Sequence, residues 1–437
     1  MNLLNNKILQ FIFITVCVLY FLKFGFLNSQ NIHFDFYIFY TAGSLFNSGK
    51  DVYNQELFRE TLYNLVGNRT FPEAWIHYVY PPQATFLFSL FAHFPIAVAH
   101  KIAWLTNTLL LVINLGLTGY ILSQYKSLKT IDYCLIVSFL LTGFAYENIT
   151  NSQSGILIST LLLLTYIFTQ SNKNILAAIS LALTSIKPSF FPFFLMYFII
   201  RRQYLSAFYC LIFAAIFTII PLLITGVPIV STLTDWFTAM GSWGISGNPN
   251  SPDPLGPFGF HFSMIDLAPL IYRLFNGQTF VAVLTVKIII GIILMYCTWL
   301  FLKKPEKDKI SLLDFGLVSV IAMLFVYHRR YDIFLLFPGL LYIYLHILEC
   351  NRSQARKFWI YLLCAVILLI SFVDILFTRI SLTLSFLQTS YFWKLILPLP
   401  WSGVITLAAL LWLKTQNRLP KTSGESQLLS KEALFSN

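Results

Sequence analysis

Asp35 is a carboxylate in an unusual setting, the run His33-Phe34-Asp35-Phe36-Tyr37-Ile38-Phe39-Tyr40. The run follows the first long apolar segment by a few residues, where a membrane helix would leave the bilayer. Aromatic residues gather at membrane interfaces, and an ionisable group at membrane depth is costly enough to suggest a function. Such a carboxylate can act as a general base. A solvated loop aspartate or the N-cap of the next helix is the alternative.

Several basic residues are predicted on the outer side of the membrane, against the usual bias. Lys187 stands at a break in an apolar run, and Arg329 and Arg330 follow His328 between two apolar segments. Charge at this depth needs a partner. A lipid phosphate would satisfy all of them, because arginine binds phosphate through paired donors and lysine acts as a point charge.

Each of these residues also has an interpretation without a substrate. Lys187 can extend its ammonium group to lipid headgroups. Arg329 or Arg330 can pair with Asp332 or with anionic lipid, and His328 can be an ordinary interface histidine. The histidines are too scattered along the chain to predict a metal site, so neither a metal nor another cofactor is expected.

The composition is that of a polytopic membrane protein. The 437 residues are 57% hydrophobic and only 11% charged, whereas a soluble domain carries about 25% charged residues. The net charge of +11 is spread over short loops. That distribution follows the positive-inside rule and predicts no nucleic-acid partner. The six cysteines form no CxxC and indicate neither a disulfide framework nor a zinc site.

Apolar segments separated by basic loops predict an all-α bundle of about twelve transmembrane helices with both ends inside. Residues 82–94 are expected to dip into the membrane without crossing it. The two segments that meet at Lys187 are too short to cross independently and predict a broken hairpin with its tip near the outer surface. The expected spans are residues 8–26, 96–122, 131–146, 155–168, 175–186, 188–200, 205–225, 280–302, 312–327, 333–348, 358–376 and 391–413.

The predicted domain organisation is one transmembrane domain over residues 1–413, followed by a polar cytoplasmic tail, 414–437, whose composition predicts disorder. Two external segments are long: 28–80, which is polar and helix-prone, and 226–278, which is rich in Gly, Pro, Ser and aromatic residues. The second is expected to be an irregular loop of the kind that often covers a binding site. A carboxylate, several cations and such a loop on one face suit group transfer from a membrane phospholipid, because the carboxylate can deprotonate a hydroxyl while the cations stabilise a departing phosphate.

At these residues the chain resembles glycosyltransferase family 87, membrane enzymes of the GT-C class that include polyprenyl-phosphate-mannose-dependent mannosyltransferases and arabinofuranosyltransferases. The resemblance covers roughly the first two thirds of the chain. One departure is Ser152, where the family usually has glycine. The motifs that carry it are Asp35-Phe36-Tyr37, Tyr40-Thr41-Ala42-Gly43, Gly49-Lys50-Asp51-Val52-Tyr53, Tyr78-Val79-Tyr80-Pro81-Pro82, Ser152-Gln153-Ser154-Gly155, Lys187-Pro188 and Tyr327-His328-Arg329-Arg330-Tyr331-Asp332.

The resemblance implies an inverting transfer of a sugar, with mannose expected, from a polyprenyl-phosphate donor to a hydroxyl of a glycolipid or glycan. Asp35 would be the general base, and Phe36 after it argues against a metal-dependent relative. Amphipathic surface helices would form within 28–80. The donor phosphate would be held by Lys187, Arg329, Arg330 and His328, and the substrate-binding residues would be His33, Tyr40, Tyr80 and Gln153; for Tyr80 an interface anchor is the alternative.

The resemblance further implies a multi-pass protein of the bacterial inner membrane with an extracytoplasmic active site. Two other classes remain open. An O-antigen polymerase or ligase also has about a dozen spans and outward arginines, but usually carries its key residues in the later loop. A transporter or flippase for a lipid-linked sugar should show inverted repeats and broken helices at the membrane midplane, and neither is evident in the sequence.

Overall fold

The computed structural model describes residues 7–21, 32–67, 76, 78–125, 127–138, 143–242, 250–255, 264–303, 310–350, 353–371 and 398–416. In these ranges the protein is an all-α bundle, as the sequence predicts, and the only β-pairing is an isolated bridge between Met264 and Arg329. The helices are α1 Lys7–Phe21, α2 Phe34–Asn47, α3 Gln55–Val66, α4 Pro82–Phe91, α5 Ile96–Tyr125, α6 Thr130–Ser138, α7 Gly143–Thr150, α8 Gly155–Gln170, α9 Asn174–Leu183, η5 Thr184–Ile186, α10 Phe191–Ile200, α11 Tyr204–Thr225, α12 Ile229–Ser242, α13 Ala268–Leu274, α14 Phe280–Lys303, α15 Leu312–Phe325, η7 Arg330–Leu336, α16 Phe337–Glu349, α17 Ser353–Ser371 and α20 Pro398–Thr415.

Several predicted features lie partly outside the described residues. They include the end of the first span at 22–26, parts of the first external segment at 28–31 and 68–75, residues 139–142 of the span at 131–146, the Gly/Pro-rich stretch 243–249, the end of a span at 372–376, the start of the last span at 391–397, and the tail from 417 onward. The predicted division into a domain and a tail therefore stays a prediction.

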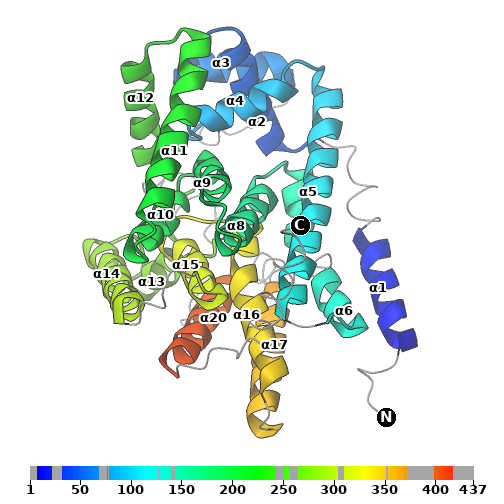
Figure 1. Ribbon diagram of the computed structural model, residues 1–437. Coiled ribbons are helices and arrows are strands. Elements are labelled where there is room, and N and C mark those ends of the chain that lie inside the picture. Colours follow the sequence, from blue (N-terminus) through cyan, green and yellow to red (C-terminus); the bar gives the residue numbers. More distant parts are fainter. Residues whose placement is uncertain are drawn as a thin grey trace, which may run out of the picture.

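Among the described residues, five helical segments are long and apolar enough to cross a membrane: α5, α11, α14, α17, and the continuous segment Arg330–Glu349. The last is 94% buried, whereas α14 is 17% buried. Arg330–Glu349 therefore forms the centre of the bundle, with α15, α17 and α20 against α16 (Figure 1). The exposed apolar side chains of the outer helices are what lipid contact requires, because a soluble protein rarely exposes such a surface. The total of twelve spans stays a prediction.

The hairpin around Lys187 is broken as the sequence predicts. Helices α9 and α10 have 10 residues each, about 15 Å of helix against a hydrocarbon core of about 30 Å. Lys187 itself is extended, at φ −126° and ψ 92°, because proline disfavours the helical conformation of the residue before it. Helix α4 also has 10 residues, too few to cross, in agreement with a segment that only dips into the membrane.

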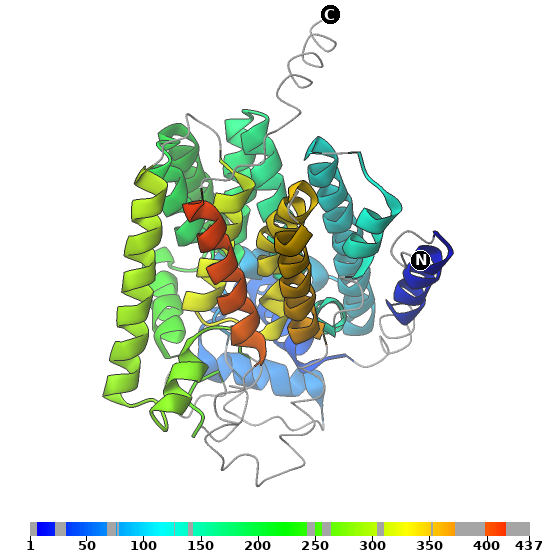
Figure 2. The same ribbon diagram turned by 90° about the horizontal axis from the view of Figure 1, so that it is seen from below.

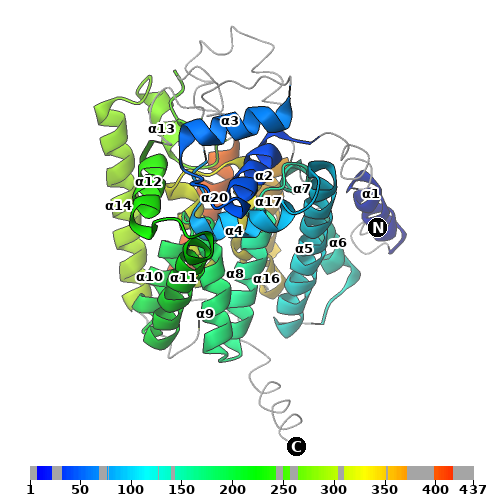
Figure 3. The same cartoon turned by 90° about the horizontal axis from the view of Figure 1, so that it is seen from above.

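One end of the bundle carries a helix that lies across it. Helix α3 runs crosswise to the long helices there, with α2, α7, α12 and α13 at the same end (Figures 2 and 3). Its buried residues Phe58, Leu62 and Val66 recur every four positions, so one face packs on the protein while Glu56 and Glu60 stay exposed. This is the amphipathic surface helix expected within 28–80.

Helix α2 differs from that expectation, because it is an internal helix. Nine of its 14 residues are buried. Gly43 lies so close to α4 that an added Cβ would stand 2.6 Å from the Phe88 carbonyl oxygen. The aromatic and aliphatic side chains of α2 cover all sides of the helix, which suits burial rather than a surface position.

The second external segment is also more regular than predicted. Residues 229–242 form α12 and residues 268–274 form α13. The prediction of an irregular loop rested on the Gly and Pro residues at 243–250, most of which lie outside the described residues.

Candidate active site

Asp35 lies in the first turn of α2, where two side chains and the helix end hold it. Gln153 Nε2 donates a hydrogen bond to Asp35 Oδ2 at 2.5 Å. His33 is the N-cap of α2, and its Nδ1 accepts from the Asp35 backbone N–H at 3.3 Å. The N-cap interpretation of Asp35 is therefore wrong, since His33 fills that position. The Asp35 side chain is 25% exposed, so the carboxylate is anchored and still accessible.

Tyr80 supports Gln153 from the other side. Its hydroxyl lies 3.4 Å from Gln153 Oε1 and donates to it. Burial raises the pKa of Tyr80 well above its ordinary value, and the nearby charges of Asp35 and Asp332 raise it further. The hydroxyl is therefore a permanent donor. The ring packs edge-on against Phe39 of α2 at 5.3 Å, which holds Tyr80 beside the helix that carries Asp35.

Ser152 precedes Gln153 in a left-handed backbone conformation. Its φ is +53°, a region that glycine adopts without cost and other residues adopt only at single turn positions. The glycine that the family usually has here suits the same turn. Serine at this position is strained but keeps the turn, and Gln153 still contacts Asp35.

Asn148 and Gly155 tie this turn to the segment that carries the cations. Asn148 Nδ2 donates to the Tyr331 carbonyl at 2.7 Å, and its Oδ1 accepts from the Ile156 N–H at 3.3 Å. A Cβ on Gly155 would overlap the Tyr331 carbonyl and stand 2.6 Å from Asn148 Oδ1. Sequence reasoning did not single out Asn148, which lies in a polar stretch, residues 147–154, between two apolar segments.

Lys187 forms a buried ion pair with Asp332. Its Nζ lies 2.6 Å and 2.5 Å from the two carboxylate oxygens. The side chains of Lys187 and Asp332 are 11% and 1% exposed. His328 is fully buried, stacks on Phe190 with ring centroids 4.2 Å apart, and has its Nδ1 3.1 Å from Asp332 Oδ2. Asp332, a predicted alternative partner for the arginines, thus pairs with Lys187.

The two arginines have different partners. Arg330 forms an ion pair with Glu147 of α7 at 2.5 Å. Arg329 donates from Nε to the Tyr327 hydroxyl at 2.5 Å and from Nη2 to Asn250. The sequence suggested a ligand as the partner of these cations, and the structure supplies protein partners for each of them.

Asp35, Lys187 and Arg329 nevertheless come together. Asp35 interacts electrostatically with both Lys187 and Arg329, although the three lie far apart in sequence. Tyr40 takes another direction, since its hydroxyl donates to the Phe94 carbonyl at 2.8 Å. It anchors α2 to the turn before α5, five residues along the helix from Asp35.

The segment after α12, which was predicted to be external, also contacts this site through its backbone. Ile265 N–H donates to the His328 carbonyl at 3.0 Å. Asp266 accepts from the Ala268 N–H at 3.0 Å and from the His328 N–H at 3.4 Å. Burial raises the pKa of Asp266 to about 7. Sequence reasoning missed Asn250 and Asp266, whose only signal was their place in a Gly/Pro-rich external segment.

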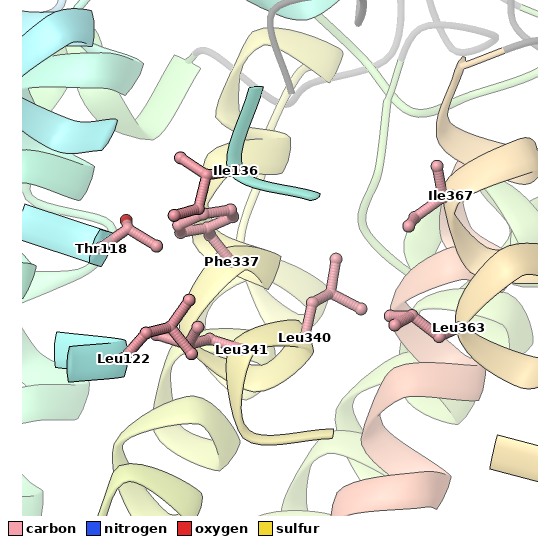
Figure 4. A pocket seen from close by; sticks show the side chains of 8 residues that line it. All are labelled: Thr118, Leu122, Ile136, Phe337, Leu340, Leu341, Leu363 and Ile367. Carbon is pink, nitrogen blue, oxygen red and sulfur yellow. The ribbon is translucent and has the colours of Figure 1, made fainter. Parts of the chain in front are cut away.

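The pocket drawn in Figure 4 is a separate feature. It lies between α5, α6, α16 and α17 and has no charged residue in its lining. Thr118 of this pocket and His100, which packs against Phe36 at 5.0 Å, are both on α5, about 27 Å apart along the helix. The lining residues are Thr118, Leu122, Ile136, Phe337, Leu340, Leu341, Leu363 and Ile367. Among the described residues, no group of three or more His, Cys, Asp or Glu side chains could hold a metal ion.

Comparison with known proteins identifies the family. The sequence model of glycosyltransferase family 87 matches residues 78–327. The match includes Tyr80, Gln153 and Lys187, while Asp35 precedes it and Arg329 follows it. No curated protein and no solved structure matches the chain. Because the matched residues are more than half of a chain with several apolar membrane-length helices, the protein belongs to glycosyltransferase family 87 and is an integral membrane glycosyltransferase.

Proposed function

We propose that this glycosyltransferase transfers a sugar, mannose in the first instance, from a polyprenyl-phosphate donor to an acceptor hydroxyl, with inversion and without a metal. The observation that carries the proposal is the Asp35 carboxylate, which is partly exposed, bonded to Gln153, and close enough to Lys187 and Arg329 to interact with their charges. A base beside fixed cations is what transfer from a phosphate leaving group needs.

Asp35 is the general base. Its free oxygen takes the proton of the acceptor hydroxyl while that oxygen forms a bond to the anomeric carbon of the sugar. The bond between this carbon and the phosphate oxygen breaks, and the electron pair leaves with the polyprenyl phosphate. The hydrogen bond from Gln153 fixes the direction of the carboxylate. Gln153, Tyr80 and His33 surround the sugar and the acceptor, while Tyr40 fixes α2 through the Phe94 carbonyl.

The cations stabilise the leaving phosphate. Arg329 and Arg330 are both partly exposed, and a guanidinium can bind two phosphate oxygens at once. Lys187 and His328 lie deeper and share Asp332. They contribute by fixing the turn from 328 to 332, at which the Asp332 N–H donates to the Arg329 carbonyl at 2.8 Å.

The extracytoplasmic face of a bacterial inner membrane is the proposed location. The amphipathic helix α3 and the start of α2 lie at one end of the bundle (Figure 3). Basic residues predominate in the loops predicted at the opposite end, such as Arg201 and Arg202, and cytoplasmic loops carry this excess. The acceptor is a glycolipid or glycan that reaches this outer end.

The test is transfer of radiolabelled sugar from polyprenyl-phosphate donors by the purified protein in lipid nanodiscs. Asp35→Asn keeps the shape of the side chain and removes the base, so the rate should fall at least about a hundredfold. Asp51→Asn is the matched control, because Asp51 lies in the same external segment and accepts from the Tyr53 N–H at 2.9 Å. Full turnover by Asp35→Asn would show that Asp35 is not the base. Absence of transfer by wild type from every polyprenyl-phosphate sugar would remove the proposed donor.

A further inference from the structure

Asn250 contacts Arg329, one of the cations of the site. It is 6% exposed. Its Oδ1 accepts a hydrogen bond from the Tyr327 hydroxyl at 2.7 Å and another from Nη2 of Arg329. The Tyr327 hydroxyl in turn accepts from Nε of Arg329 at 2.5 Å. The three side chains close a ring of hydrogen bonds that fixes the plane of the guanidinium group.

Asn250 is itself held by a short folded stretch, residues 250–255. The Asp253 N–H donates to Ser251 Oγ at 3.2 Å, and the Leu255 N–H donates to Asp253 Oδ1 at 2.9 Å. Ser251 Oγ also donates to Gln278 Oε1 at 3.5 Å, near the start of α14. The amide of Asn250 is therefore presented by a segment with its own hydrogen bonds and not by a free side chain.

The side chains that contact Arg329 differ in charge from those that contact Lys187 and Arg330. Lys187 contacts the Asp332 carboxylate and Arg330 contacts the Glu147 carboxylate. Asn250 and Tyr327 are neutral acceptors. They orient the guanidinium group of Arg329 and add no negative charge of their own beside it.

We propose that Asn250 is a positioning residue that presents the Arg329 guanidinium to the phosphate of the donor. The inference rests on the proposed function, since the phosphate is that of the polyprenyl donor. It assigns a role to the second external segment, which supports a group on the opposite side of the transferred sugar from Asp35. Amide rather than carboxylate chemistry is the essential property of this position.

The experiment measures binding of polyprenyl phosphate, with neutral polyprenol as the reference, and the KM and kcat of transfer, in nanodiscs. Asn250→Ala should weaken phosphate binding and raise the donor KM about tenfold, because the guanidinium loses an oriented hydrogen bond. Arg329→Ala should weaken binding at least as much. The double variant Asn250→Ala/Arg329→Ala should equal Arg329→Ala, because Asn250 acts only through Arg329. Asn174→Ala, at an exposed asparagine at the start of α9, is the control and should leave phosphate binding and KM unchanged.

Asn250→Asp separates positioning from simple structural support. Aspartate keeps an acceptor for Tyr327 and Arg329, so the free energy of unfolding should match or exceed that of wild type. It also supplies a charge that competes with phosphate, so binding should still weaken about tenfold or more. A purely structural role predicts wild-type binding by this variant.

The failures can be told apart. Wild-type binding and KM in Asn250→Ala, or independent additive losses in the double variant, overturn the role of Asn250 and leave the proposed function standing. If wild type itself shows no preference for polyprenyl phosphate over polyprenol and transfers no sugar from it, both the donor assignment and this inference are wrong.

Discussion

Replacing Lys187 measures how far the ion pair with Asp332 holds the site together. The Asp332 side chain is 1% exposed and accepts from Lys187 at 2.6 Å and 2.5 Å. Removing one partner of a buried pair leaves an uncompensated charge, which costs about 3–5 kcal/mol. We expect Lys187→Met to lower the free energy of unfolding by this amount, since methionine keeps most of the aliphatic stem and little of the loss comes from an empty space.

The double variant Lys187→Met/Asp332→Asn completes the cycle. Both charges are then gone, and a neutral amide remains beside His328 at a cost of about 1–2 kcal/mol for its unmade hydrogen bonds. The double variant should therefore be more stable than either single variant, with a coupling energy of about 3 kcal/mol or more, at the upper end of the range for residues in direct contact. Free energies of unfolding come from denaturant titration of the purified protein in detergent micelles. Lys173→Met, at an exposed lysine, is the control and should change stability by less than about 0.5 kcal/mol.

One result would refute this reasoning. If Lys187→Met stays within about 1 kcal/mol of wild type, Asp332 does not depend on Lys187 and the pair is not a structural unit. Transfer assays on the same variants separate two roles of Lys187. Recovery of activity in the double variant would mean that Lys187 acts through Asp332, whereas loss of activity in every variant lacking the ammonium group would indicate direct contact with the donor phosphate.

Three further predictions concern the surroundings of the site. Ser152→Gly relieves the strain at φ +53°, so this variant should be about 1 kcal/mol more stable than the control Ser154→Gly in thermal unfolding. Ser154 has an ordinary φ of −87° and, like Ser152, a buried hydroxyl without a hydrogen-bond partner among the described residues. Equal stabilities of the two variants would contradict the strain at Ser152. Gly155→Ala should lower transfer about tenfold or more by pushing the Gln153 turn away from Tyr331, whereas Gly116→Ala, which meets nothing within 4 Å, should leave the rate unchanged. Burial raises the pKa of Asp266 from 3.8 to about 7, so the folded state binds the proton more tightly than the unfolded state does. The free energy of unfolding should therefore fall by up to about 4 kcal/mol as the pH rises from about 4 to about 7. Asp266→Asn should flatten this pH dependence in denaturant titrations, and an unchanged slope would show that Asp266 is not its source.

The sequence predicted those features of the fold that depend on residues close together in the chain. Hydropathy predicted the all-α membrane bundle, and Pro188 predicted the break at Lys187. The periodicity of α3 matched its surface position. Helix α2 was harder, because one aromatic-rich stretch suits an interface and an interior equally well. The burial of nine of its 14 residues and the packing of Gly43 against α4 distinguish the two.

The partners of the charged groups could not be read from the sequence. Asp35 and Gln153 are separated by 118 positions, and Lys187 and Asp332 by 145. Nothing local selects Asp332 for Lys187 over Arg329 or Arg330, each of which lies closer to it in the chain. That choice depends on how η5 and η7 pack in three dimensions. The sequence predicted that the cations lie at the site, but it did not predict which protein groups pair with them.

The separation of Lys187 from Asp332 has a consequence for biogenesis. At about 5–20 residues per second, the ribosome needs roughly 7–30 s to add the 145 positions between them. The hairpin of α9 and α10 is thus made well before its counter-charge exists. A lysine at the tip of a short hairpin can meanwhile reach water or headgroups, which a lysine in the middle of a full-length span could not. The break at Pro188 therefore suits the order of synthesis as well as the finished site. It lets Lys187 stay outside the hydrocarbon until Asp332 has been synthesised.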